Sequence, residues 1–264
     1  MKPFLKRIYK TSVAYGFDPK KLVIMLNAKR KNTFVNDRRE FLRQRGSDDS
    51  FQWGRLYPIL MDKQDEGGTM KGDYFHQDLY VAQQIYKANP QKHLDIGSRT
   101  DGFVAHVASF REIEMIDIRP IRSHVKNIIF RQADLMHLPE DMKDYCDSVS
   151  SLHAIEHFGL GRYNDPIDYN GHLKGIENIT QMLKSGGTFY FSVPIGPQRV
   201  EFNAHRVFSL EYLISILSPN YTIKSFSYVN DSGDLIENAE LTDQSIQSNF
   251  SCWYGCGIFI LLKK

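Results

Sequence analysis

Hydrophobic and polar positions alternate between two spacings along most of this chain, and the alternation predicts strands separated by helices. Seven short apolar runs rich in Val, Ile, Phe and Tyr have the composition of strands, and apolar residues recur at helical spacing in several segments between them. The expected strands are residues 91–97, 112–118, 126–134, 145–154, 188–194, 221–229 and 257–264. Strands that alternate with helices in this way predict an α/β protein with a doubly wound, largely parallel sheet.

Helical spacing predicts one helix before the first strand and further helices after the first, fourth and fifth strands. The inward face expected for the first helix, residues 74–90, consists of Phe75, Leu79, Ala82 and Tyr86. The second helix is expected in residues 100–110. The third is expected in residues 170–187, where Gly186-Gly187 should end it. Ser209 is the expected N-cap of the fourth.

The first fifty residues differ from the rest in charge. They hold thirteen Lys and Arg against five Asp and Glu, although the net charge of the whole chain is only +2. Basic helices of this kind are either a solvated extension or a face for a membrane surface, a protein or a polyanion. We therefore expect a basic helical N-terminal extension with a linker over residues 1–73, and a main domain over residues 74–264.

Composition narrows the class of protein. A hydrophobic content of 42% with 12% aromatic residues is enough for a packed core. Three cysteines are too few and too odd in number for a disulfide scaffold, and Cys252 and Cys256 lack partners at zinc-ligand spacing, so no metal site is expected. The apolar run 22–26 is too short for a signal peptide or a membrane span. These features favour a cytoplasmic protein.

The stretch HLDIGSRTDGF, residues 93–103, is the first candidate for chemistry. It joins a strand ending in Asp95 and Gly97 to a helix that starts near Gly102, and ligands of such sheets bind at the carboxyl ends of the strands. Ser98 and Arg99 stand where a dinucleotide loop has glycines, and the Lys-Ser/Thr pair of a phosphate-binding loop is missing. The spacing therefore argues against a nicotinamide dinucleotide and against ATP hydrolysis.

Carboxylates at the next two strand ends favour a nucleoside ligand. Asp117 follows Gly97 by twenty residues, the distance at which an acidic side chain reaches ribose hydroxyls. Asp134 ends the third strand, where it could accept from an adenine amine. A single Asp at a strand end is more often a cap or a solvated loop residue, but three in register favour a common site.

The ordered segments HLDIGSRTDG, IEMIDIRP, RQADLMHLP, YCDSVSSLHAIEHF and LKSGGTFYFSVP together resemble the motifs of class I S-adenosylmethionine-dependent methyltransferases. The resemblance covers about residues 74–264. Within that superfamily, YFHQDL, DIGSR, DGFVAHVASF, DIRP and HRVFS resemble a group often associated with surface-polysaccharide or O-antigen gene clusters in bacteria.

The resemblance implies a Rossmann-like methyltransferase fold, with a mostly parallel seven-stranded sheet whose last strand is antiparallel. It implies S-adenosyl-L-methionine as cofactor, with the methionine part near Asp95 and Gly97, the ribose on Asp117, and adenine near Asp134 and Leu135. The remaining candidates for cofactor contact are Ser98, Arg99, Gly102 and Ile118. The segment Tyr74–Asp78 is a further candidate for the cofactor carboxylate.

The resemblance also places His153, Glu156 and His157 beside the transferred methyl group. A histidine is a suitable general base for a sugar hydroxyl near neutral pH, and a carboxylate can orient it. The structural alternative is a packed His153 with a turn capped by the next two residues. His205 is the second candidate for the base. The chain lacks an Asn-Pro-Pro-Tyr motif after the fourth strand, which argues against methylation of exocyclic nitrogens.

The loop 158–171 is rich in Gly, Pro, Asp and Tyr, and it is either a substrate loop or a plain turn-rich connection. Tyr163 and Tyr169 could stack on sugar rings, and Arg162 could bind phosphate or carboxylate. The leading hypothesis is therefore a transferase that O-methylates a sugar or polysaccharide precursor, with a small-molecule or carbohydrate acceptor. The alternatives are an RNA-directed methyltransferase, which the charge pattern disfavours, and an inactive methyltransferase-fold scaffold.

Overall fold

A computed structural model describes residues 28–60, 62–64 and 66–264 of the chain. The chain divides into two units, Met1–Thr69 and Met70–Lys264. The basic segment expected within residues 1–27 lies outside the described residues. In the described part of the chain, no helix has the length and apolarity needed to cross a membrane.

The described part of the first unit contains one long helix, α3 (Ala28–Arg45), and a short 3-10 helix, η1 (Asp62–Gln64). Basic residues and an ion pair between Arg43 and Glu40 keep α3 polar, and it has no continuous apolar stripe. Phe41 packs edge-on against Trp53, and both rings stay largely exposed. The expected basic helix is thus present over residues 28–45, without the amphipathic face that a membrane-surface helix needs.

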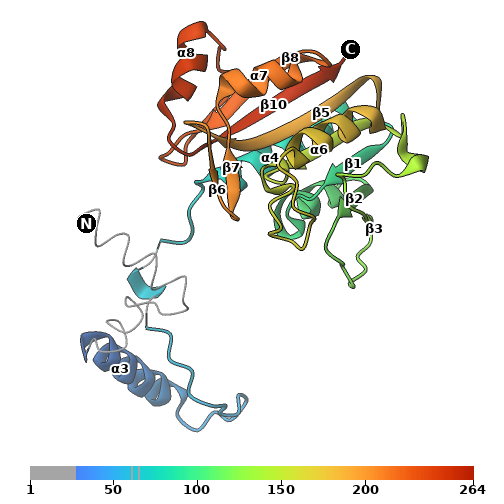
Figure 1. Cartoon of the computed structure of the whole chain (residues 1–264). Helices are drawn as coiled ribbons and strands as arrows, with labels where there is room; N and C mark the ends of the chain where they lie inside the picture. The colour runs from blue at the N-terminus through green and yellow to red at the C-terminus, as the bar shows by residue number, and fades with distance from the viewer. Residues whose placement is uncertain (1–27, 61, 65) are drawn as a thin grey trace. The chain divides into compact units, whose positions relative to one another are not determined.

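The second unit is built on a twisted eight-stranded sheet in the order β3-β2-β1-β4-β5-β10-β8-β9 (Figure 1). The strands are β1 (His93–Ile96), β2 (Ile113–Asp117), β3 (Ile128–Gln132), β4 (Cys146–Leu152), β5 (Leu183–Ile195), β8 (Tyr221–Val229), β9 (Leu235–Ile236) and β10 (Gly255–Lys263). The first five pair in parallel, and β10 runs antiparallel to both β5 and β8. All seven expected strands are present, the last of them antiparallel, and β9 adds a two-residue edge.

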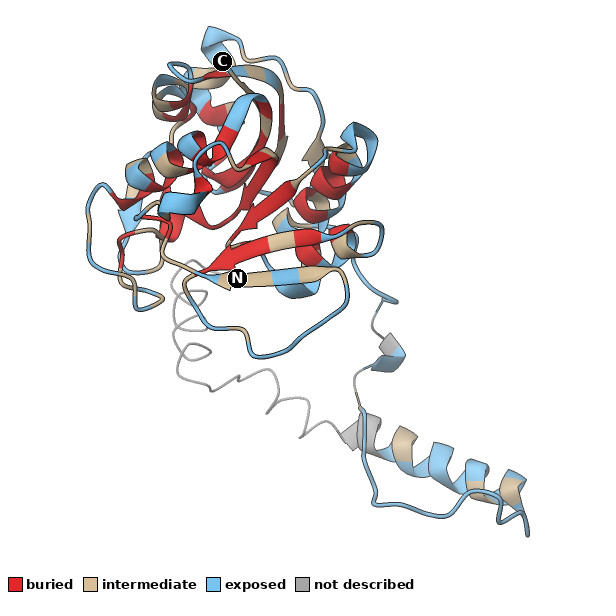
Figure 2. Cartoon of the chain, turned by 90° about the vertical axis from the view of Figure 1, so that its right-hand side faces the viewer, coloured by how far each residue is buried: buried red, intermediate tan, exposed pale blue. Residues whose placement is uncertain are grey.

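Helices cover both faces of the sheet, so the unit has three layers with a core on each side. The helices are α4 (Asp73–Ala88), α5 (Ala105–Ala108), α6 (Gly171–Met182), α7 (Leu210–Leu217) and α8 (Asp243–Ser248). One core joins α6 and α7 to the sheet, and the other joins α4 and α5 to its opposite face. Figure 2 shows buried residues concentrated on the strands and on the helix sides that face them. The expected doubly wound α/β architecture is confirmed.

Two details of the expected helices are wrong. In α4 the buried face is Gln77, Asp78, Tyr80, Val81, Ala82 and Ile85. Phe75, Leu79 and Tyr86 are exposed, because α4 carries two apolar stripes and packs on the other one. The helix α6 ends at Met182 rather than at Gly186-Gly187, since Leu183 already pairs with Cys146 at the start of β5. The five residues 183–187, which helical spacing assigns to the helix, therefore belong to β5.

The helix after β1 is also irregular. It opens as a π-helix, η2 (Thr100–Val104), and continues as the short α5. Gly102 lies in η2. A side chain has no space at this position, because a Cβ there would come within 2.1 Å of a carboxylate oxygen of Asp78. Ser209, by contrast, caps α7 as expected, since its hydroxyl accepts from the backbone N–H of Tyr212 at 3.2 Å.

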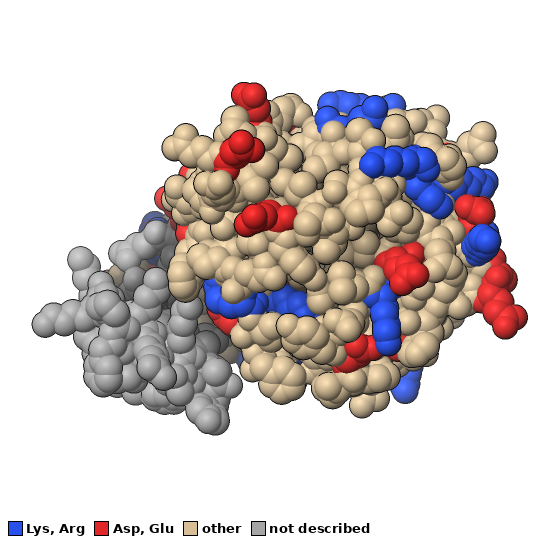
Figure 3. Space-filling view, turned by 45° about the horizontal axis from the view of Figure 1, so that its top comes forward, with Lys and Arg blue, Asp and Glu red and all other residues tan. Residues whose placement is uncertain are grey.

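Several elements have no counterpart in the sequence-based expectation. The hairpin of β6 (Arg199–Glu201) and β7 (His205–Val207) forms a separate small sheet between β5 and α7. The polar stretch after residue 230 contains β9, α8 and the 3-10 helix η5 (Asn249–Ser251). On the face seen in Figure 3, acidic and basic side chains are interspersed among a larger uncharged area. No single-sign patch dominates that face.

Candidate functional site

A cavity lies at the carboxyl ends of β1, β2 and β3, open to solvent. It is lined by Ile96, Gly97, Ile116, Asp117, Ile118, Arg119, Ala133, Asp134, Leu135, Met136, His153, Ala154, His157, Phe158, Tyr163 and Asp165. Its position is the one at which parallel α/β sheets bind ligands, because the loops that leave neighbouring strands diverge there.

Gly97 supplies bare backbone to the floor of this cavity. Its φ of +68° is one that only glycine adopts without strain. A Cβ at this position would lie 3.0 Å from the Cβ of Ala154, which is tighter than an ordinary contact. Glycine is therefore required here by conformation and by space together, and it leaves room for a ligand against the end of β1.

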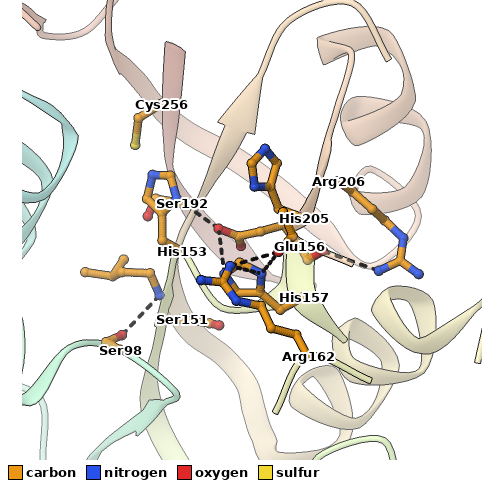
Figure 4. A network of polar contacts seen from close by, with 12 residues as sticks. Ser98, Ser151, His153, Glu156, His157, Arg162, Ser192, His205, Arg206 and Cys256 are labelled. Atoms are coloured by element: carbon orange, nitrogen blue, oxygen red, sulfur yellow. Dashed lines mark hydrogen bonds and ion pairs between the residues drawn. The ribbon is translucent and has the colours of Figure 1, made fainter. Parts of the chain in front are cut away.

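The polar residues that replace glycines in the following loop do not fill the cavity. Ser98 is buried and faces inward, where its hydroxyl donates to Asp95 at 2.6 Å. The same hydroxyl accepts from the backbone N–H of Leu152 at 3.1 Å (Figure 4). Arg99 points outward, pairs with Asp101 at 2.9 Å and lies over the ring of Tyr74. Neither side chain lines the cavity.

Asp95 is fully buried and its carboxylate is used inside the protein. It accepts from the backbone N–H and hydroxyl of Ser98 and from the hydroxyl of Ser150. Burial raises the pKa of Asp95 to about 6, although these hydrogen bonds oppose the shift. Asp95 therefore holds the loop in shape and does not itself line the cavity.

Asp117 faces the cavity, but an arginine already holds both its oxygens. The Nε of Arg119 donates to Oδ1 at 3.0 Å, its NH2 group donates to Oδ2 at 2.6 Å, and its backbone N–H donates to Oδ1 at 2.8 Å. The side chain of Asp117 is only 7% exposed, whereas that of Arg119 is 49% exposed. The arginine is thus the movable partner of a fixed carboxylate.

The far end of the cavity is an apolar slot. Ile116, Ile118, Ala133, Leu135 and Phe158 line it with few polar atoms. Asp134 lies at its edge, where Oδ1 accepts from the backbone N–H of Met136 at 2.9 Å and Oδ2 is 3.3 Å from Nδ1 of His137. A flat aromatic group fits between such walls, because it gains burial on both faces.

His153 and Glu156 form a buried pair in the turn after β4 (Figure 4). Nδ1 of His153 lies 2.9 Å from Oε1 of Glu156, and the two side chains are 4% and 1% exposed. Burial alone would lower the pKa of His153, but the side chains of Cys256 and Glu156 next to it hold the pKa well above its ordinary value. Burial likewise opposes the charge of Glu156, and the neighbouring imidazole keeps its pKa low.

Two atoms of this pair remain without a hydrogen-bond partner. Nε2 of His153 and Oε2 of Glu156 are buried and unpaired. His153 also has a φ of +51°, an uncommon conformation for a residue with a side chain. Strained backbone and unpaired buried polar atoms cluster at functional sites, so both features point to ligand contact at this turn.

His157, unlike His153, is held as a neutral imidazole. Its Nδ1 lies 2.7 Å from the carbonyl oxygen of Ala204, which can only accept, so Nδ1 carries the proton and Nε2 keeps its lone pair. Nε2 lies 3.7 Å from Oε1 of Glu156. Burial lowers the pKa of His157, against the pull of Glu156. His157 is therefore a neutral imidazole near pH 7, with its basic nitrogen fixed in place.

The hairpin β6–β7 brings His205 to the same carboxylate (Figure 4). Burial lowers the pKa of His205, and its Nε2 lies 3.5 Å from Glu201 of the same hairpin. The buried Arg206 fastens the hairpin by donating to the carbonyl oxygens of Phe158 at 2.6 Å and Tyr169 at 3.1 Å. His205 does not line the cavity and lies behind the His153–His157 turn.

The loop 158–170 closes the mouth of the cavity with one of its tyrosines. Tyr163 lines the cavity and meets the ring of His157 edge-on at 5.4 Å. The guanidinium of Arg162 lies 5.0 Å from the centre of the same tyrosine ring and donates to the carbonyl oxygen of Ala204 at 2.9 Å. Tyr169 is 83% exposed and lies away from the cavity.

The structure thus brings half of the expected site residues to one cavity. Those that line it are Gly97, Asp117, Ile118, Asp134, Leu135, His153, His157 and Tyr163; those that do not are Asp95, Ser98, Arg99, Gly102, Glu156, Arg162, Tyr169 and His205. Sequence reasoning missed Arg119. Its signal was the Asp-Ile-Arg spacing, since side chains two apart in extended chain point to the same side.

The comparisons agree with this geometry at the level of fold. Residues 105–252 match the model of a family described as "Caenorhabditis protein of unknown function, DUF268". No curated protein matches the chain.

Two solved structures are similar. One is 1,6-didemethyltoxoflavin-N1-methyltransferase of Burkholderia thailandensis with bound 1,6-didemethyltoxoflavin and S-adenosylhomocysteine; it is 15% identical, with a TM-score of 0.51, over 71% of this chain and 78% of that chain. The other is a candidate sarcosine dimethylglycine methyltransferase from Galdieria sulphuraria, 13% identical, with a TM-score of 0.50, over 71% of this chain and 85% of that chain. The second unit therefore has the fold of class I methyltransferases.

Proposed function

The chain belongs to the DUF268 family, and we propose that it is an S-adenosylmethionine-dependent methyltransferase. The observation that carries the proposal is a single cavity lined both by Gly97 and Asp117 and by His157. An in-line transfer to an oxygen needs a methyl donor and a base at the same acceptor atom, and residues suited to each of them line this one cavity.

The residues of the cavity fit the cofactor that the fold implies. The apolar slot beside Leu135 suits adenine, the carboxylate of Asp117 can accept from ribose hydroxyls, and Gly97 leaves space for the methionine chain. The cofactor supplies an electrophilic methyl group when bound. Ser98 and Arg99 leave the cavity free, so the unusual loop is compatible with binding.

The four expected catalytic residues take different roles in this proposal. His157 is the base, because it lines the cavity and its Nε2 is left unprotonated when Nδ1 donates to the carbonyl oxygen of Ala204. Glu156 is a positioning residue, because its Oε1 lies 2.9 Å from Nδ1 of His153, which lines the cavity. His205 adds to the polar surroundings of Glu156 and does not contact the cavity.

We propose a hydroxyl acceptor, with a sugar or polysaccharide precursor as the best candidate. A neutral histidine base near a buried ion pair suits a hydroxyl, which must lose a proton as the methyl group arrives. Tyr163 offers a ring at the mouth on which a sugar can stack. RNA is a poorer acceptor, because the face in Figure 3 mixes both signs of charge and gives no continuous basic track there.

Titration calorimetry with S-adenosylhomocysteine tests this function against an inactive scaffold. We expect the wild-type protein to bind, and Asp117→Ala to weaken binding by about 1–3 kcal/mol, the cost of leaving ribose hydroxyls unpaired. Asp141→Ala, an exposed carboxylate paired with Arg131, is the matched control and should bind as the wild type does. Absence of binding by the wild-type protein would contradict the proposal.

A further inference from the structure

Arg119 occupies the part of the cavity that a ribose needs. Its side chain places one N–H donor on each carboxylate oxygen of Asp117, at 3.0 and 2.6 Å. Two neighbouring ribose hydroxyls would donate to the same two oxygens. The guanidinium therefore stands in for the diol, and a ribose that binds Asp117 must displace it.

Arg119 has a second partner that remains after such a displacement. Its guanidinium carbon lies 4.3 Å from the centre of the Tyr163 ring, and the guanidinium carbon of Arg162 lies 5.0 Å from the same centre. Two cations thus share one aromatic ring at the mouth of the cavity. Tyr163 meets the ring of His157, the proposed base, so this place borders the acceptor.

Of the two arginines at this place, only Arg119 forms an ion pair among the described residues. Among the ion pairs of the described residues, Arg119 pairs with Asp117, and Arg162 has no carboxylate partner. Asp165, the other carboxylate lining the mouth, accepts from the backbone N–H groups of Gly161 and Tyr163. Once Arg119 is released, two guanidinium groups without a carboxylate remain beside Tyr163.

We propose that Arg119 exchanges Asp117 for an oxyanion on the acceptor when the cofactor binds, and that it forms the acceptor-binding group together with Arg162. This rests on the proposed function and adds a substrate class: the acceptor carries a phosphate or carboxylate near the hydroxyl that is methylated. Planar guanidinium groups bind such oxyanions through paired N–H donors, which an exposed ammonium cannot match. The cofactor then binds first, because it creates the anion site.

Calorimetry with S-adenosylhomocysteine tests the exchange on the full chain. Arg119→Ala removes the competitor of the ribose, so we expect its affinity to rise about fivefold above that of the wild type, the factor for a partly exposed ion pair. Arg122→Ala, an exposed arginine three residues away, is the matched control and should leave the affinity unchanged. Thermal melting of each variant checks that it is folded.

The same titrations with inorganic phosphate or acetate, at constant ionic strength, test the acceptor class. Binding is reciprocal, so an anion that draws Arg119 away from Asp117 should tighten S-adenosylhomocysteine binding to the wild type and not to Arg119→Ala. An effect of phosphate alone identifies a phosphorylated acceptor, and an effect of acetate identifies a carboxylate.

The possible negative results of these titrations can be distinguished from one another. Unchanged or weaker binding by Arg119→Ala overturns the exchange, while the proposed function stands. Tighter binding by that variant without any effect of either anion on the wild type overturns the anionic acceptor. If the wild-type protein binds no S-adenosylhomocysteine at all, the proposed function fails and the exchange fails with it.

Discussion

The loop after β1 shows how single side chains decide whether the cavity is open. Ser98 turns inward to Asp95, and Arg99 turns outward to Tyr74, so two positions that are often glycines in nucleotide loops carry side chains at no cost to the cavity. Gly97 has no alternative, because its backbone is left-handed and its missing Cβ faces Ala154. The requirement for glycine at the cavity is therefore concentrated in this residue.

Gly97→Ala separates strain from crowding. We expect it to cost about 1 kcal/mol of stability through the positive φ and, in addition, to weaken S-adenosylhomocysteine binding, since the new methyl group must displace Ala154 or the ligand. Chemical denaturation measures the first effect and calorimetry the second.

The matched control for that change is Gly186→Ala. Gly186 has a similar φ of +74°, but nothing lies within 4 Å of a Cβ built there. It should lose comparable stability and keep full affinity. Equal affinity of the two variants would show that Gly97 is needed for backbone conformation alone.

At the scale of elements, the hairpin β6–β7 completes the site from outside the sheet. It supplies the carbonyl of Ala204 that fixes the protonation of His157, and it is fastened by Arg206. That buried guanidinium joins three backbone segments, the hairpin itself, the turn after β4 and the loop that ends at Tyr169. The geometry of the proposed base thus depends on an element inserted between β5 and α7.

Arg206→Met should loosen this element. It removes a charged donor from buried carbonyl oxygens, for which we expect a loss of about 2–3 kcal/mol in the free energy of unfolding, measured in urea. Lys224→Met, on the exposed side of β8, removes the same charge without such contacts and should change stability little. A loss no larger than that of the control would mean that Arg206 does not hold the hairpin.

At the scale of the whole molecule, burial leaves two carboxyl groups with raised pKa values close to the cofactor loop. Burial raises the pKa of Asp78 to about 6, as it does that of Asp95. A carboxyl group whose folded pKa exceeds its unfolded value stabilises the fold when protonated, and this contribution is lost as the pH rises through the folded pKa. Ionisation of these two carboxyl groups therefore lowers the stability of the second unit at neutral pH.

Asp78→Asn should reveal this cost. As the pH falls from about 6 to 4, the wild type should gain stability relative to the variant by about 1.4 kcal/mol per pH unit, because only the wild type takes up the proton on folding. Urea unfolding at several pH values measures the difference. Asp49→Asn, at an exposed position, should give a constant difference from the wild type, and a flat profile for Asp78→Asn as well would contradict the raised pKa.

The division into an extension and a main domain stays a prediction. The N–H of Gly72 donates to the carbonyl of Gly233 at 2.9 Å, and Lys71 pairs with Asp234 at 3.1 Å. We therefore place the start of the separable domain at Met70, where the second unit begins, rather than at residue 74.

The seven main strands and the helices between them could be predicted from the sequence, whereas the hairpin β6–β7, β9 and α8 could not. Alternation of apolar residues marks strands because side chains of a strand point to opposite faces, and the pairing rules of α/β sheets then bring Gly97, Asp117 and Asp134 to one edge. The buried face of α4, the boundary between α6 and β5, and the contact of Arg119 with Asp117 become visible only in the folded structure. In each case the local sequence allows two arrangements of similar stability, and packing across the whole unit selects one of them.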